Sequence, residues 1–140
     1  MIVCYDAEQN ENVLDGLLLQ ELVEKTGRTT RNNQTISLVF EEMGVYAGGI
    51  LAKIAFESCY IDLLAVKKEF RGKGIAQRLL EELEGRCRAL GITTIYLNTQ
   101  DYQAKGFYLK MQYALVAQVD DIPFAGTTRY YFVKRLCLPP

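Results

Sequence analysis

The sequence contains no histidine among its 140 residues. Histidine is the side chain whose charge changes most readily near neutral pH and is the commonest metal ligand, so its absence excludes a histidine general base and any histidine-ligated metal. A metal site would have to be built from four cysteines that stand singly along the chain, Cys4, Cys59, Cys87 and Cys137. Structural zinc sites usually take closely spaced cysteine pairs, so we expect no bound metal.

The cysteines also lack the dense spacing of a disulfide framework, and no secretory segment is evident. We therefore expect reduced, buried thiols in a cytoplasmic protein. An excess of charge is missing too, because 16 Lys and Arg residues face 17 Asp and Glu residues for a formal charge of −1. Nucleic-acid binding requires a clustered basic face, so no nucleic-acid partner is expected, and no membrane partner either.

No internal repeat, low-complexity tract or shift in composition marks a linker, and the length suits one domain over residues 1–140 with its own core. Hydrophobic periodicity predicts an α/β fold, a mixed and mostly antiparallel sheet of six to seven strands with helices on both faces. Gly48 and Gly49 interrupt a strand, which indicates a bulge or a close backbone approach more than a substrate contact. The expected strands are 1–5, 35–41, 45–56, 59–66, 92–98, 113–119 and 128–136, and the expected helices are 10–26, 75–90 and 103–111.

The most informative stretch runs from a buried strand at residues 60–66 through Arg71-Gly72-Lys73-Gly74 into the helix that Gly91 ends. The first N–H groups of such a helix have no partner and carry its positive dipole end, so they favour an anion, although Gly-x-Gly is also found in merely cramped turns. The stretch lacks the Gly-Lys-Ser/Thr of a P-loop. It also fails the dinucleotide fingerprint, because Gln77 stands where the third glycine belongs.

This stretch resembles motif A of the GNAT superfamily of N-acetyltransferases, Gln/Arg-x-x-Gly-x-Gly/Ala. Arg71, Gly74 and Ala76 match the motif, and the strand before it ends in valine, here Val66, as in the family. The order of predicted elements also matches the GNAT order. The resemblance therefore covers most of the chain and implies a GNAT sheet that splays at the strand ending in Val66.

A second stretch resembles the family's Ala-x-x-Phe-Tyr-x-Lys-x-Gly-Phe helix. Four positions match, namely Ala104, Phe107, Tyr108 and Lys110. The segments that begin at Asn98 and Thr128 resemble a bacterial subgroup that acts on small substrates. Two departures are visible: Gln112 occupies the glycine position that ends the helix, and Thr127 and Thr128 stand where the subgroup commonly has a histidine.

The resemblance implies an acetyl-CoA-dependent N-acetyltransferase that acts directly on a primary amine of a small molecule or on an exposed amino group, such as that of a peptide. In the family the loop amides hold the pyrophosphate of acetyl-CoA, and free amides at the splayed strand bind pantetheine and the transition-state oxyanion. The positions implied for this co-substrate are Leu64, Ala65, Val66, Arg71, Gly72, Lys73, Gly74, Ile75, Ala76, Asn98 and Phe107. Asn98, at a strand end, is equally typical of a turn.

The resemblance places Tyr108 as the donor of a proton to the departing sulfur, whereas without the motif an aromatic on a short helix would indicate core packing. Asp62 is the candidate general base, because it shares a strand face with Leu64 and Val66 if the alternation is unbroken. A bulge would reverse that face, and a plain solvated carboxylate or a water base is the alternative.

A GNAT-like module that binds acyl-CoA without turnover, as a sensor or partner-binding domain, is the competing hypothesis. Tyr108 discriminates against it, since such a module has no use for a proton donor. Tyr130 to Val133 form an apolar run on both faces of the last strand, which indicates a homodimer, and a strand buried on both sides within one chain is the alternative.

Overall fold

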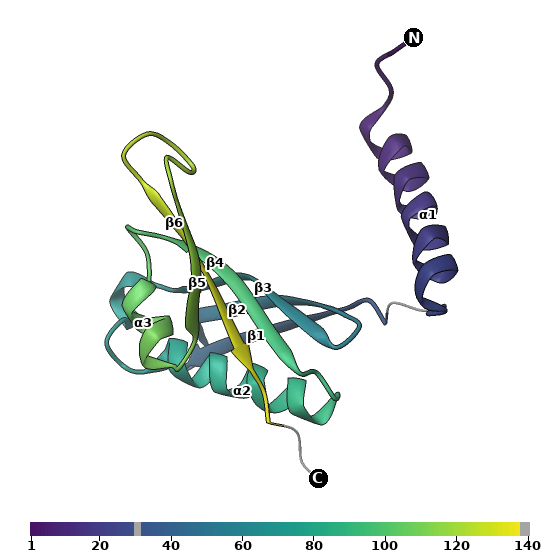
Figure 1. The fold of residues 1–140 in the computed structure, drawn as a ribbon. Coiled ribbons are helices and arrows are strands. Elements are labelled where there is room, and N and C mark those ends of the chain that lie inside the picture. The colour runs from purple at the N-terminus through teal and green to yellow at the C-terminus, as the bar shows by residue number, and fades with distance from the viewer. Residues whose placement is uncertain (30–31, 138–140) are drawn as a thin grey trace. The chain divides into compact units, whose positions relative to one another are not determined.

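The computed structural model describes residues 1–29 and 32–137 and divides the chain into two units, Met1–Arg31 and Asn32–Pro140. The first unit contains helix α1, Ala7–Thr26 (Figure 1). The helix begins after Asp6, whose side chain accepts a hydrogen bond from the Gln9 N–H at 3.0 Å, and it ends at Gly27 with a left-handed φ of 74°. The predicted stop at Gly27 is confirmed, and the Asp6 cap explains why the helix starts before residue 10.

The strand predicted for residues 1–5 is wrong. These residues form no strand, and the side chains of Met1, Ile2, Val3 and Tyr5 are exposed. A short apolar run becomes a strand only where a neighbouring strand accepts its hydrogen bonds, and the run itself does not specify that neighbour.

The second unit is built on a sheet of six described strands in the order β1-β2-β3-β4-β6-β5, with β3 and β4 parallel and every other pair antiparallel. The predicted mixed, mostly antiparallel sheet is confirmed. The bounds are β1 Gln34–Glu42, β2 Val45–Ala55, β3 Ser58–Val66, β4 Thr94–Gln100, β5 Ala114–Asp120 and β6 Thr128–Arg135.

The strands β3 and β4 pair only at their first residues. The parallel register covers Ser58 to Tyr60 against Thr94 to Tyr96, whereas β3 continues to Val66. The splay predicted at the strand ending in Val66 is therefore present. It leaves the β4-facing backbone groups at the end of β3 without a strand partner, so they can bind something else.

Helix α2, Ile75–Ala89, lies on one face of this sheet (Figure 1), and its apolar stripe is part of the buried core. Helix α3, Lys105–Lys110, contacts the same face, because the Tyr108 ring lies 5.7 Å from the ring of Phe132 in β6. A helix on the opposite face stays a prediction, since α1 belongs to the other unit. None of the helices in the described residues has the length and apolar character that crossing a bilayer requires.

The two glycines of β2 are explained by close approaches, of β3 at Gly48 and of the Tyr46 side chain at Gly49. A Cβ on Gly48 would lie 2.8 Å from the carbonyl oxygen of Ala65, so only glycine fits there, and the predicted close backbone approach is confirmed.

The four cysteines differ in burial. Cys59 and Cys87 are buried as predicted, but Cys4 and Cys137 are exposed, so the prediction is wrong for these two. Both exposed cysteines lie near a chain end, outside the packed core.

Candidate functional site

A pocket of about 540 Å³ lies between the end of β3, the turn that follows it, the start of α2 and one side of α3. The splay of β3 from β4 and the packing of α3 on β6 together place it there. Ten of the predicted site residues line it, namely Leu64, Ala65, Val66, Arg71, Gly72, Gly74, Ile75, Ala76, Phe107 and Tyr108. The two sequence motifs, about thirty residues apart, therefore meet at one cavity.

The turn into α2 has the geometry of an anion site. Gly72 and Gly74 have left-handed φ values of 79° and 77°, and a Cβ built on either would meet nothing within 4 Å. Gly74 is the N-cap of α2 and supplies no side-chain cap, so the first N–H groups of the helix remain available beside open space. With the dipole of a fifteen-residue helix behind them, these groups favour a phosphate.

The cations of the turn are not all directed to the pocket. Arg71 lines it and donates from Nε to the Val66 carbonyl at 3.2 Å, which fixes the arginine against the end of β3. Lys73 is not among the lining residues. Its ammonium lies 3.6 Å from a carboxylate oxygen of Glu42 and 5.3 Å from the centre of the Phe70 ring.

Tyr108 is packed among aromatic rings at the wall of the pocket. The residue is only 5% exposed, and its ring contacts the rings of Phe107, Tyr113 and Phe132 at 5.2 to 5.7 Å. Burial raises the pKa of Tyr108 to about 12, so the phenol keeps its proton at neutral pH. Among the described residues no hydrogen-bond partner occupies its hydroxyl, which leaves the phenol free to donate to a ligand.

The exit of α3 keeps the geometry that a glycine usually supplies. Gln112 has a left-handed φ of 67°, its N–H donates to the Leu109 carbonyl at 3.1 Å, and the Tyr113 N–H donates to the Tyr108 carbonyl at 2.9 Å. This pair of bonds is the Schellman ending of a helix. The departure at Gln112 therefore costs some backbone strain but leaves the helix end in place.

Besides Lys73, two other predicted site residues do not line the pocket, Asn98 and Asp62. Asn98 donates from its side-chain amide to the Tyr60 hydroxyl at 2.9 Å. Asp62 lies at a β-bulge, where Ala52 pairs with Ile61 and Leu51 with Leu63, so the alternation on which its predicted face depended is broken.

The partner of Asp62 identifies its actual face. Its carboxylate lies 3.3 Å from the ammonium of Lys53, an exposed residue between two buried ones in β2. Asp62 therefore projects from the sheet face opposite α2, whereas Leu64 and Val66 pack toward the core on the α2 side.

Four further residues line the pocket that the sequence did not single out for it, namely Phe70, Gln77, Ala104 and Lys110. Ala104 and Lys110 belong to the second motif, so their place in that motif was the available signal. Gln77 lies in the first turn of α2. Phe70 ends the short 3₁₀ helix Lys68–Phe70, and its aromatic side chain before the glycine turn gave no specific signal.

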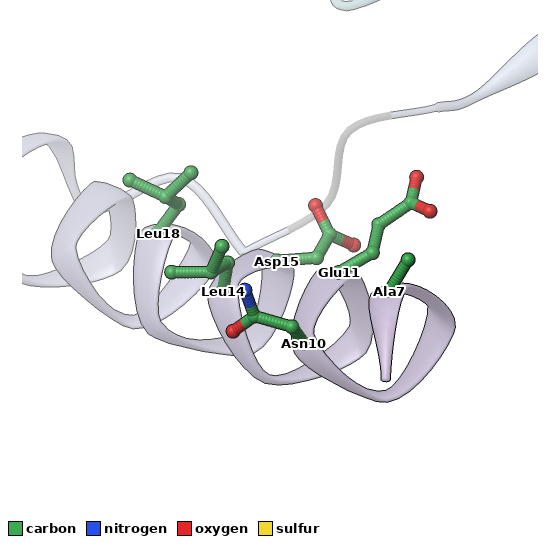
Figure 2. Close-up of a pocket in the computed structure, with 6 residues that line it drawn as sticks. All are labelled: Ala7, Asn10, Glu11, Leu14, Asp15 and Leu18. Atoms are coloured by element: carbon green, nitrogen blue, oxygen red, sulfur yellow. The ribbon is translucent and has the colours of Figure 1, made fainter. Parts of the chain in front are cut away.

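A separate hollow of about 360 Å³ lies on α1 in the first unit. Figure 2 shows that its six lining side chains, Ala7, Asn10, Glu11, Leu14, Asp15 and Leu18, all come from successive turns of this one helix. It contains none of the predicted site residues. A groove on a single helix does not bring together chemistry from distant segments, so the pocket at α2 and α3 is the candidate site.

Comparison with known proteins identifies the family of this chain. The sequence matches the Acetyltransferase (GNAT) family over residues 5–113. It is 36% identical over 96 residues to a blasticidin-S acetyltransferase from Streptomyces morookaense, covering 68% of this chain and 70% of that protein. The crystal structure of an acetyltransferase from Bacillus cereus superimposes with a TM-score of 0.88, at 28% identity over 97% of each chain. The chain belongs to the GNAT family and is an N-acetyltransferase.

Proposed function

We propose that this enzyme transfers an acetyl group from acetyl-CoA directly to a primary amine of a small molecule. One observation carries the proposal: a single pocket brings together the unpaired amides at the start of α2, the splayed end of β3 and the protonated phenol of Tyr108. The relative from Streptomyces morookaense, a blasticidin-S acetyltransferase, favours a small-molecule acceptor over an amino group of a protein.

The pyrophosphate of acetyl-CoA would lie at the turn from Arg71 to Ala76. The start of α2 has no side-chain cap, open space beside Gly72 and Gly74 leaves room for the phosphate, and Arg71 and Lys110 supply positive charge at the pocket. Lys73 can contribute only if it leaves Glu42, so we assign it a smaller part. The pantetheine arm would then follow the edge of β3 that faces away from β2, from Val66 to Leu64, where no strand pairs with it.

The reaction joins the amine nitrogen to the thioester carbonyl carbon and breaks the carbon–sulfur bond. Negative charge develops first on the carbonyl oxygen, where the free amides of Leu64 to Val66 would stabilise it. It then develops on sulfur, to which Tyr108 would donate. Because a thiol has a pKa of about 8.5 and Tyr108 one of about 12, complete proton transfer is unfavourable, so the phenol acts chiefly as a hydrogen-bond donor to the leaving sulfur.

The amine must lose its proton before it attacks. An amine with a pKa of about 10.4 costs roughly 4 to 5 kcal/mol to deprotonate at neutral pH, whereas holding two reactants together contributes about 7 to 11 kcal/mol. Because positioning contributes more than deprotonation costs, a weak base suffices. We propose Asp62 for this role, acting through a water from the sheet face opposite α2, with water alone as the alternative.

Other properties of the chain remain proposals. The family match crosses both structural units, which supports one GNAT domain over the whole chain. A cytoplasmic enzyme would keep Cys59 and Cys87 as reduced, buried thiols. A homodimer through the region of β6 fits the apolar run at Tyr130 to Val133.

The test is release of free coenzyme A thiol from acetyl-CoA in the presence of a panel of primary amines that includes blasticidin S. We expect release that depends on both the enzyme and one class of small amine, with the acetylated amine seen by mass spectrometry. Calorimetry with acetyl-CoA alone is the control. Binding without turnover of any amine would instead favour the acyl-CoA-binding module.

A further inference from the structure

A buried ion pair joins α2 to β6 behind the pocket. Glu84 of α2 is 4% exposed, and both of its carboxylate oxygens lie 3.0 Å from the ammonium of Lys134 in β6. The side chain of Lys134 is 18% exposed. Neither residue lines the pocket, and nothing in the reaction described above uses them.

The same two side chains hold the end of α3. Lys134 also donates a hydrogen bond of 3.0 Å to the carbonyl of Met111, the C-cap residue of α3. The Lys134 ammonium lies 5.3 Å from the centre of the Tyr113 ring. The Tyr113 hydroxyl lies 3.4 Å from the Glu84 carboxylate, to which it can donate. The ion pair thus contacts both the Met111 carbonyl at the end of α3 and Tyr113, the residue after the left-handed Gln112.

Tyr113 and Tyr108 are tied to each other in two ways. The Tyr113 N–H donates to the Tyr108 carbonyl at 2.9 Å, and the two rings meet edge to face at 5.7 Å. Since α3 has only six residues, it has few bonds of its own to fix its position. The position of the Tyr108 ring therefore depends on the contacts that hold the C-terminal end of α3.

The chemistry of the pair favours a positioning role over a purely stabilising one. Burying two charges carries a desolvation penalty that their attraction only roughly offsets, so apolar or neutral replacement of both is often tolerated. The pair contributes geometric specificity, because the ammonium has three fixed acceptors and the carboxylate has two oxygens. Only one arrangement of α2, α3 and β6 satisfies all of these hydrogen bonds.

We propose that Glu84 and Lys134 are positioning residues that fix Tyr108 at the wall of the pocket through Met111 and Tyr113. The inference rests on the proposed donor role of Tyr108. Without the pair, α3 can shift on the sheet while the turn at Gly74, which contacts neither residue, keeps its geometry. Turnover then falls much more than acetyl-CoA affinity, because among the residues assigned to acetyl-CoA only Phe107 and Lys110 move with α3.

The test is the double variant Glu84→Gln/Lys134→Met, which removes both charges and leaves neither unpaired. We expect kcat to fall about tenfold to a hundredfold, the scale of a displaced catalytic group, with the KM for acetyl-CoA within about twofold of the original. The matched control is Glu82→Gln/Arg86→Met, which removes an exposed ion pair of 2.9 Å on the same helix and should change neither constant.

A second background separates this inference from the proposed function. In a Tyr108→Phe enzyme the double variant should cause no further loss of kcat, because the group that it positions is gone. If Tyr108→Phe alone is fully active, the donor role itself fails. If Tyr108→Phe is impaired, the inference is overturned by a fully active double variant, by a further tenfold loss in the Phe background, or by a change confined to KM.

Tyr113→Phe provides the measurement should the double variant not fold. It removes only the hydroxyl that faces Glu84 and keeps the ring against Tyr108. We expect kcat to fall about two- to tenfold, the range for one hydrogen bond, with unchanged KM for acetyl-CoA. Unchanged kcat in this variant counts against the inference.

Discussion

The side-chain amide of Asn98 donates a hydrogen bond of 2.9 Å to the Tyr60 hydroxyl, immediately beyond the last parallel pair of β3 and β4. The Tyr60 ring also lies 5.1 Å from the ring of Tyr96, its partner in that pair. Together these contacts fasten the two strands at the point where they diverge. The width of the splay, and with it the access to the end of β3, is thus set by side chains on both strands.

The first prediction concerns the acetyl-CoA loop. Gly74→Glu should abolish acetyl-CoA binding in calorimetry, because the new side chain would fill the open space beside the first turn of α2 with a negative charge. The carboxylate would repel the pyrophosphate at the place where the N–H groups of α2 would otherwise bind it.

Gly91→Glu is the matched control. Gly91 follows the other end of α2 with the same φ of 77° and the same open space, so the substitution carries the same strain and charge away from the pocket. Its acetyl-CoA affinity should equal that of the original enzyme. Undiminished binding by Gly74→Glu, or equal loss in both variants, would place the pyrophosphate elsewhere.

The sequence predicts the elements that depend on local pattern. The strands from β1 to β6, α2 and the turn at Gly74 follow from periodicity and glycine position, which are properties of a few neighbouring residues. The bulge at Asp62 could not be predicted, because it depends on the register with β2. Glu84 resembles the other acidic residues of its helix in the sequence, and only the fold brings Lys134 beside it, fifty positions away.

The second prediction tests the base. Asp62→Asn should lower kcat/KM for the amine about ten- to a hundredfold at neutral pH, because the amide cannot accept the proton. Lys53→Met is the comparison, since it removes the partner of Asp62 but keeps the carboxylate. It should stay within a few-fold of the original enzyme. Equal and small effects in the two variants would show that Asp62 and Lys53 have only a structural role and that water is the base.

The third prediction concerns assembly. Tyr130, Tyr131 and Val133 of β6 are only half-buried, whereas Phe132 between them is fully buried. Light scattering at micromolar concentration should give a mass close to twice the 15.9 kDa of one chain. Tyr131→Glu should shift the measured mass toward that of one chain. A monomer mass for the unmodified enzyme would contradict the dimer.

The last prediction is that Tyr108→Phe lowers kcat much more than it weakens acetyl-CoA binding. The ring contacts with Phe107, Tyr113 and Phe132 survive, and only the donor is lost. General acid catalysis contributes about a hundred- to ten-thousandfold, and we expect the lower end because a thiol with a pKa of about 8.5 leaves tolerably unaided. Tyr102→Phe, at an exposed tyrosine outside the pocket, should leave kcat unchanged.

The pH dependence separates the donor role of Tyr108 from simple packing. Burial raises the pKa of Tyr108 to about 12, so the phenol stays protonated from about pH 6 to 9 and adds no inflection of its own there. The need for a donor, however, declines as the pH approaches the thiol pKa of about 8.5, because the free thiolate is then no longer much less stable than the thiol. The ratio of mutant to original kcat should therefore rise across this range. A Tyr108→Phe enzyme that is fully active at every pH would make Tyr108 a packing residue and assign the leaving sulfur to water or another donor.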